Sequence, residues 1–181
     1  FIDLAYQGLG ESLIKDSIGV RILGEACAEL IVASSYSKNF GLYRERVGSL
    51  QIVSPNTKQS NVVQSQLGSV VRGIYSMPPS HGAAIVESIL GDERLKTMWR
   101  KELESMRNRI NLLRTELASG LSDETSRDFS FIKTQRGMFS FLGISAKQVA
   151  KLQETYAIYM VDSSRINVAG INDTNIAYFI E

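Results

Sequence analysis

The sequence predicts an α/β protein, with a mainly parallel sheet and covering helices up to about residue 91 and a smaller α+β unit after it. In the first part, short apolar runs alternate with helix-like segments, which is the order expected of parallel strands joined by crossover helices. In the second part, a long amphipathic pattern leads into short strand-like segments separated by turns. We therefore expect two units, one at residues 1–91 and one at residues 92–181.

Length and composition narrow the possible classes of function. The chain has 181 residues, 44% of them hydrophobic, so it can bury a core. Its 20 basic and 19 acidic residues give a formal net charge of +1, which does not suggest nucleic acid or a membrane surface as a partner. The single Cys27 and the single His81 provide neither an internal disulfide nor a Cys/His metal cluster. No apolar run approaches the roughly 20 residues of a membrane span, and no signal peptide is visible. We expect no metal site.

The first segments read as strand, turn, helix and strand. Residues 1–6 resemble the end of a strand, and a turn follows at residues 7–10. Asp16 or Ser17 can cap a helix that runs toward Cys27. Residues 30–33 form a continuous apolar run, which predicts a strand buried on both faces.

The next segments continue the alternation. We expect a strand at residues 48–54 and a helix that begins at Ser60 or Asn61. This helix must end before the Met77-Pro78-Pro79 segment, because a residue that precedes proline disfavours helix. Residues 81–90 predict a short buried helix.

The second part begins with a long helix. Asp92 is a good N-cap, Gly120 can end the helix, and the apolar side chains between them recur every three or four residues. Ser145 and Gln148 form the pattern of a capping box at the start of another helix. The remaining expected elements are strands at 129–133, 138–142, 156–161 and 165–169, and a last helix from Asn172 or Thr174.

The segment Ser34–Gly48, with the sequence SSYSKNFGLYRERVG, carries the chemistry. It lies between two predicted strands, and ligands bind where strands of α/β sheets meet their loops. Lys38 follows several serines and stands eight residues before Arg46. The spacing suggests a reactive amine beside an anion site, whereas a polar surface loop is the alternative interpretation.

Five segments in order point to one family. They are DLAYQG (3–8), SSYSKNFGLYRERVG (34–48), YSMPPSHGA (75–83), RGMFSFLG (136–143) and SRINVAG (164–170). With them, the chain resembles the C-terminal half of the pyridoxal-phosphate aspartate aminotransferases of the fold-type I group. The resemblance implies that residues 1–91 are the C-terminal part of the cofactor-binding large domain. It also implies that residues 92–181 are a long helix and the small domain.

The resemblance implies three roles around the cofactor pyridoxal 5'-phosphate. Lys38 would form an imine with the pyridoxal aldehyde and, once freed, move the α-proton of the substrate. Asp3 would pair with the pyridine nitrogen and keep it protonated. Tyr6 would donate a hydrogen bond to the ring oxygen of the cofactor.

The resemblance also implies a phosphate site. Ser35, Ser37 and Arg46 match the phosphate contacts of the family, since hydroxyls and a guanidinium suit that anion. For Ser37, a position facing away from the site is the alternative. Arg44 stands where the family commonly has asparagine, and we interpret it as a surface substitution.

The substrate residues follow in the same way. Arg165 would clamp the α-carboxylate, although Ser164 replaces the glycine that is usual before it. Phe139 would line the substrate entrance, or else pack in the core of the small domain. Arg72 would reach into the site of the neighbouring subunit and bind the side-chain carboxylate of aspartate or glutamate, while Met77 stands where asparagine is usual.

The resemblance therefore implies an aminotransferase that moves an amino group between aspartate and 2-oxoglutarate by a ping-pong mechanism, in a homodimer with a shared active site. Two alternatives stay open: an aromatic amino acid aminotransferase of the same family, and a non-catalytic truncated fragment. We expect a cytoplasmic location. A mitochondrial or plastid location stays open, because any targeting segment would precede Phe1.

Overall fold

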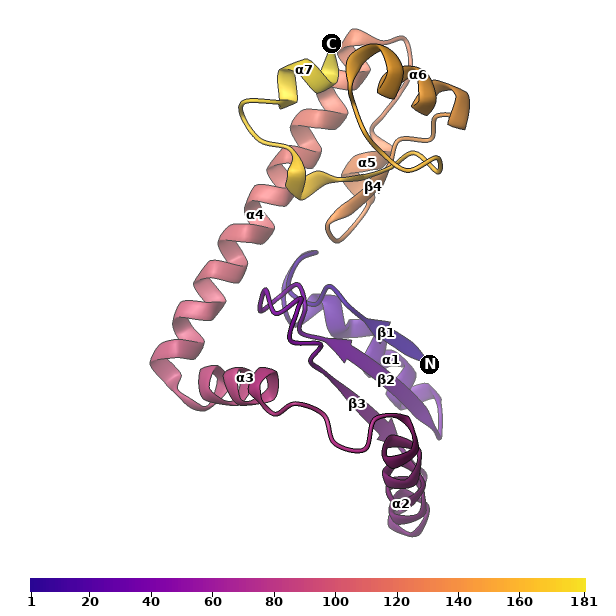
Figure 1. Ribbon diagram of the computed structural model, residues 1–181, viewed down its shortest axis with the longest axis vertical. Coiled ribbons are helices and arrows are strands. Elements are labelled where there is room, and N and C mark those ends of the chain that lie inside the picture. The colour runs from indigo at the N-terminus through magenta and orange to yellow at the C-terminus, as the bar shows by residue number, and fades with distance from the viewer. The chain divides into compact units, whose positions relative to one another are not determined.

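The computed structural model describes residues 1–181, which divide into two compact units, Phe1–Glu104 and Ser105–Glu181 (Figure 1). Each unit contains its own small sheet, with three strands in the first and two in the second. The boundary expected between residues 91 and 92 refers to the domains of a longer protein and stays a prediction.

The sheet of the first unit has the order β1-β2-β3. Its strands are β1 (Ile2–Leu4), β2 (Leu30–Ser35) and β3 (Gly48–Val53). β1 and β2 are parallel, and the chain between them passes through the 3₁₀ turn η1 (Lys15–Ser17) and helix α1 (Ile18–Ala26). The predicted parallel unit with its crossover helix is therefore confirmed. β3 runs antiparallel to β2, so the sheet is mixed.

The burial of β2 differs from the prediction. Leu30 and Val32 are buried, but Ile31 between them is 40% exposed. The expectation of a strand buried on both faces is wrong for this chain. Only one face of the strand is covered here, and successive side chains of a strand point to opposite faces.

Helices α2 (Thr57–Ile74) and α3 (His81–Gly91) follow the sheet. α2 begins earlier than the predicted Ser60 or Asn61, because the Asn56 side chain accepts the N–H of Gln59 at 3.0 Å and caps the helix. Its end before the prolines is as predicted. α3 has the predicted extent but buries only Gly82 and Val86, so the expectation of a buried helix is wrong.

Helix α4 (Glu93–Glu124) has the predicted cap and a later end. The Asp92 carboxylate accepts the N–H of Leu95 at 2.8 Å. The helix does not end at Gly120. A Cβ on Gly120 would lie 2.5 Å from Ile180 of helix α7 (Ile176–Ile180), so this glycine allows a close approach of α7 instead of ending α4.

The second unit contains β4 (Phe139–Phe141) and β5 (Arg165–Asn167), which pair antiparallel as a two-stranded sheet. The strand expected at 129–133 is wrong, since a short helix α5 (Phe131–Thr134) lies there. Asp128 accepts the N–H of Ser130 at 2.8 Å and starts a turn in place of an extended chain.

Helix α6 (Ala146–Tyr156) begins with the predicted capping box of Ser145 and Gln148. The strand expected at 156–161 is wrong, because Tyr156 ends α6 and the chain after it pairs with no strand. β5 is shorter than predicted and leads into the 3₁₀ turn η2 (Val168–Gly170). α7 begins later than predicted, since Asn172 accepts the N–H of Thr174 at 2.9 Å in a turn before the helix.

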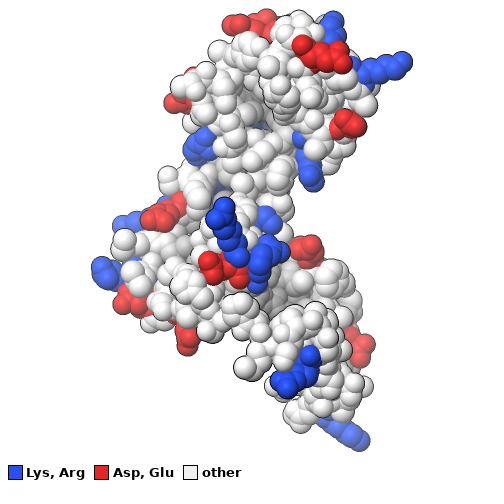
Figure 2. Space-filling model, viewed as in Figure 1, with Lys and Arg blue, Asp and Glu red and all other residues white.

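The core of the second unit forms where one face of α4 meets the sheet and the shorter helices. Its buried apolar side chains are Ile110, Leu113, Leu117, Ala118, Leu121, Phe129, Ile132, Leu142, Val149, Ile166, Val168 and Ile171. None of the helices combines the length and the apolar composition that crossing a lipid bilayer requires. On the face shown in Figure 2, basic and acidic side chains are interspersed.

Two leucines of α4 test this account of the core. Leu117 is fully buried, whereas Leu112 is 58% exposed. We expect Leu117→Ala to lower the free energy of unfolding by about 2–5 kcal/mol, because it leaves a cavity. Leu112→Ala should lower it by less than about 0.5 kcal/mol. Urea unfolding followed by circular dichroism measures both values, and equal losses would contradict the packing described.

Candidate functional site

The parallel pairing of β1 and β2 brings the segments after the two strands together. Leu4 lies opposite Ser34, so both chains leave the sheet at the same edge. Tyr6 follows β1 by two residues and Lys38 follows β2 by three. The Nζ atom of Lys38 lies 5.1 Å from the centre of the Tyr6 ring. The structure thus brings together two residues that are 32 positions apart in the sequence.

Local hydrogen bonds shape the turn that carries Lys38. The Ser35 hydroxyl accepts the N–H of Ser37 at 3.2 Å, and the carbonyl of Lys38 accepts the N–H of Gly41 at 3.1 Å. Ser37 is buried, while Ser35 and Lys38 are half-buried. Gly41 has a φ of +68°, which glycine adopts readily. The amine therefore stands on a turn that its own backbone closes.

Asn39 and Trp99 fasten this turn to its surroundings, and the sequence analysis assigned a role to neither. The Asn39 amide donates to the carbonyl of Gln7 at 3.3 Å, next to Tyr6. The Trp99 indole of α4 donates to the carbonyl of Asn39 at 2.7 Å and stacks on Phe40, with the ring centres 4.5 Å apart. These partners are distant in sequence, so no local pattern could reveal them.

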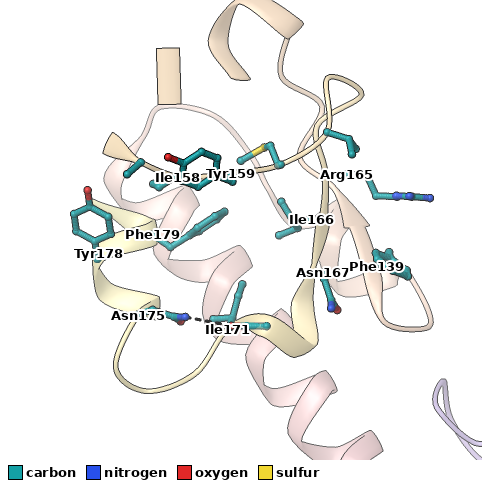
Figure 3. A pocket seen from close by; sticks show the side chains of 14 residues that line it. Phe139, Ile158, Tyr159, Arg165, Ile166, Asn167, Ile171, Asn175, Tyr178 and Phe179 are labelled. Atoms are coloured by element: carbon teal, nitrogen blue, oxygen red, sulfur yellow. Dashed lines mark hydrogen bonds between the residues drawn. The ribbon is translucent and has the colours of Figure 1, made fainter. Parts of the chain in front are cut away.

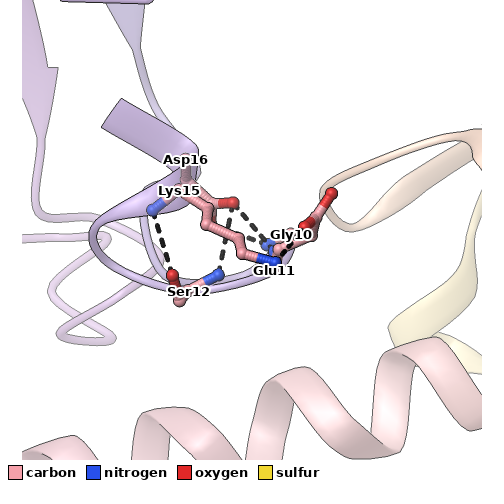
Figure 4. Close-up of polar contacts among 5 residues, drawn as sticks. All are labelled: Gly10, Glu11, Ser12, Lys15 and Asp16. Carbon is pink, nitrogen blue, oxygen red and sulfur yellow. Dashed lines mark hydrogen bonds and ion pairs between the residues drawn. The ribbon is translucent and has the colours of Figure 1, made fainter. Parts of the chain in front are cut away.

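Asp16 holds the loop after Tyr6 (Figure 4). One carboxylate oxygen accepts the N–H groups of Gly8 and Gly10 at 2.8 and 2.9 Å, and the other accepts those of Glu11 and Ser12 at 2.8 and 3.4 Å. A Cβ on Gly10 would lie 2.7 Å from Asp16, so the loop needs glycine there. Of the two caps expected for the following helix, Ser17 stands at the N-cap of α1 without a side-chain capping bond, and Asp16 instead satisfies the amides of a loop.

Apart from Lys38, the charged residues expected near the cofactor are exposed in this chain. Arg46 is exposed, donates to the carbonyl of Tyr43 at 3.2 Å and has a φ of +51°, which is uncommon for arginine. Arg44 is also exposed, and Asp3 is exposed within β1. Burial raises the pKa of the nearby Tyr43, and the Tyr6 phenol adds to the increase.

Arg72 makes no contact with Lys38. It lies exposed in the last turn of α2 and forms no hydrogen bond or ion pair. Met77, after the helix, is 78% exposed. The role expected for Arg72 stays a prediction.

In the second unit, Arg165 and Phe139 lie together on the paired strands β5 and β4. The guanidinium carbon of Arg165 is 4.9 Å from the centre of the Phe139 ring. Both side chains line a pocket of about 640 Å³, which Ile158, Tyr178 and Phe179 close on its other side (Figure 3). The lining is mainly apolar, and Arg165 is its one charged residue, with a guanidinium that extends away from Tyr178 and Phe179 in Figure 3.

The comparisons with known proteins decide the family. Residues 1–181 match the family described as Aminotransferase class I and II. The chain belongs to the class I and II aminotransferases. The family and the α/β fold expected from the sequence are therefore confirmed.

Relatives of this aminotransferase chain include two kinds of enzyme. It is 46% identical over 180 residues to the aspartate aminotransferase of Haemophilus influenzae, covering 99% of this chain and 46% of that protein. It is 45% identical over 172 residues to the aromatic-amino-acid aminotransferase of Pseudomonas aeruginosa, covering 94% of this chain and 43% of that protein. The chain thus spans about half the length of the curated relatives it matches.

A solved structure of the family also resembles this chain over about half of its own length. The crystal structure of the aromatic-amino-acid aminotransferase from Burkholderia pseudomallei, covalently bound to pyridoxal phosphate, matches with a TM-score of 0.94 and 44% identity. The match covers 98% of this chain and 45% of that one.

Ser164, directly before Arg165, has an unusual backbone in this aminotransferase chain. Its φ is +62°, in the left-handed region that favours glycine. The side chain is buried, and its hydroxyl accepts the N–H of Gly143 at 3.0 Å. The hydrogen bond offsets part of the backbone strain, which explains how serine can stand where the resemblance leads us to expect glycine.

Two substitutions separate strain from hydrogen bonding at this position. Ser164→Ala keeps the strained backbone and loses the bond, so we expect it to lower the free energy of unfolding by about 1 kcal/mol. Ser164→Gly loses the same bond but relieves strain of about 1 kcal/mol, so its stability should be close to that of the original. Urea unfolding of both variants measures this. A glycine variant as unstable as the alanine variant would contradict the assigned strain.

Proposed function

We propose that this chain is part of a pyridoxal-phosphate-dependent aminotransferase that moves an amino group between aspartate and 2-oxoglutarate. The observation that carries the proposal is the meeting of the Lys38 amine and the Tyr6 ring at the ends of two parallel strands. It occurs in a chain that matches an aminotransferase family over its whole length.

The chemistry of the side chains fits the cofactor. Lys38 supplies a primary amine that can bond to an aldehyde. Ser35, Ser37 and Arg46 supply hydroxyls and a guanidinium, which suit a phosphate group. Asp3, on the strand that leads to Tyr6, supplies a carboxylate for a protonated ring nitrogen. The covalently bound pyridoxal phosphate of the Burkholderia relative supports this choice.

Different residues of the chain have different roles in the proposed reaction. When bound, the pyridoxal ring supplies a sink for the electrons that the substrate Cα releases. The Lys38 amine would take the proton from Cα and pass it to the cofactor carbon in the first half of the reaction, and it would carry a proton back to Cα of the second substrate in the other half. Tyr6 would donate a hydrogen bond from its phenol to the ring oxygen of the cofactor. Arg165 binds the α-carboxylate and thereby orients the Cα–H bond for removal of its proton.

The substrate pair depends on Arg72. An exposed arginine at the end of α2 can bind the second carboxylate of aspartate or glutamate in the site of a partner subunit, which makes a homodimer part of the proposal. The aromatic-amino-acid aminotransferases among the relatives, at similar identity, favour aromatic amino acids as a second candidate. The proposal includes a cytoplasmic location.

The first prediction of this proposal concerns Lys38. The full-length protein, loaded with pyridoxal phosphate and reduced with borohydride, should carry one adduct at Lys38, detected by peptide mass spectrometry. Lys38→Ala should abolish the adduct and the activity, whereas the exposed Lys58→Ala should change neither. Adducts scattered over surface lysines, or none, would favour a non-catalytic fragment.

A second prediction distinguishes the two substrate classes. Arg72→Leu should lower kcat/KM for aspartate by about 10- to 100-fold, the effect of losing a charge-assisted hydrogen bond of about 1.5–3 kcal/mol. The value for phenylalanine, which has no second carboxylate, should stay the same. The exposed Arg21→Leu is the matched control and should leave both values unchanged. An unchanged value for aspartate would count against Arg72 as its ligand.

A further inference from the structure

Arg114 is a charged residue inside the core of the second unit. It lies on α4 between Leu113 and Leu117, and only 2% of it is exposed. Burial of a guanidinium carries a large desolvation cost unless the group finds hydrogen-bond partners. A leucine or methionine would fill such a position without that desolvation cost. Packing therefore does not explain the arginine, and its hydrogen-bond partners indicate its role.

All its partners lie on one short segment. The guanidinium donates to the carbonyls of Gly137 and Phe139 at 2.6 and 2.9 Å, and to the hydroxyl of Ser140. No carboxylate is among them, and the buried Nε atom has no partner. Burial lowers the pKa of Arg114, and the positive charge of Arg136 lowers it further. The guanidinium thus remains without a counter-ion and serves to order backbone.

The ordered segment is the one that carries Phe139. Phe139 begins β4, lies opposite Asn167 in the sheet and faces the guanidinium of Arg165. Ser140, the next residue, is fully buried. Arg114 holds the carbonyl of Phe139 itself and that of Gly137 two residues before it. The position of the Phe139 ring therefore depends on Arg114, and the Arg165 guanidinium lies over that ring.

We propose that Arg114 is a positioning residue for the clamp that binds the substrate α-carboxylate: it fixes β4 and Phe139, and Phe139 orients Arg165. The inference rests on the proposed function of Arg165. Arg114 touches neither substrate nor cofactor and acts only through these two residues.

The planar shape of arginine explains the choice of side chain. Its two terminal nitrogens reach three acceptors on one segment at the same time, with Nη2 shared by two carbonyls. Lysine has one nitrogen at the end of a flexible stem and cannot hold that arrangement. Methionine fills a similar volume but can donate none of these hydrogen bonds.

The experiment measures binding of succinate, which is aspartate without its amino group, to the full-length protein loaded with pyridoxal phosphate. Isothermal calorimetry gives the Kd. We expect Arg114→Lys and Arg114→Met to raise the Kd by about 10-fold, as for a weakened charge-assisted contact. In an Arg165→Met background, Arg114→Lys should cause no further increase, because the two residues act through one contact.

Arg109→Lys is the matched control. Arg109 also lies on α4 and also donates to backbone carbonyls, those of Ala169 and Ile171 at 3.3 and 2.7 Å, but not to the segment that carries Phe139. Its substitution should leave the Kd of succinate within about twofold of the original. Ser140→Ala removes one acceptor of Arg114 without removing a buried charge. It gives a second test, with a smaller increase in Kd, should the Arg114 variants fail to fold.

The outcomes separate this inference from the proposed function. An unchanged Kd in folded Arg114 and Ser140 variants overturns the inference. An Arg114→Lys effect that persists undiminished in the Arg165→Met background does so as well. The proposed function fails on different evidence, namely the absence of a Lys38 adduct in the unsubstituted protein.

Discussion

The parallel register between β1 and β2 is the constraint on which the site of the first unit depends. Because Leu4 pairs with Ser34, the two chains leave the sheet side by side, and Tyr6 and Lys38 meet without any direct bond between them. A shift of the register by one residue would turn the side chains of one strand to the opposite face. The alternation of buried Leu30 and Val32 with exposed Ile31 resists such a shift, since it would expose the buried pair.

The register brings the loops together, and polar contacts then fix them. Asp16 accepts four backbone N–H groups of the loop after Tyr6, and Asn39 ties that loop to the turn after Lys38. Each contact satisfies backbone groups that the ends of strands leave unpaired. The Trp99 indole extends the same arrangement to α4. The turn that carries Lys38 is thereby held by Asn39 and Trp99, to which the proposed function gives no chemical role.

Sequence patterns predicted what local chemistry determines. Asp92 and the Ser145–Gln148 pair cap their helices as expected, because a cap involves residues only three positions apart. Some local contacts were still missed, such as the Asn56 cap that starts α2 and the Asp128 turn before α5. Other failures lie where distant packing decides. Gly120 faces Ile180 and continues its helix, and the segment after Tyr156 lacks a partner strand. Within the site, Lys38 and Tyr6 stood out through their motifs, whereas Asn39, Trp99 and Arg114 did not. Their roles depend on partners 23 to 60 residues away.

Each unit buries a polar side chain at a position where an apolar side chain would avoid the free-energy cost of desolvation. The reason is the same in both units. Asn39 and Arg114 are buried, and each keeps one polar atom without a partner. Such atoms oppose folding, so packing alone cannot account for the two residues. Both donate to backbone carbonyls directly beside residues proposed to bind cofactor or substrate: Gln7 next to Tyr6, and the segment that holds Phe139. A side chain can be repositioned by small changes in packing, but a carbonyl held by a buried donor fixes the backbone itself. We infer that this chain gives up some stability to hold two short segments of backbone in place.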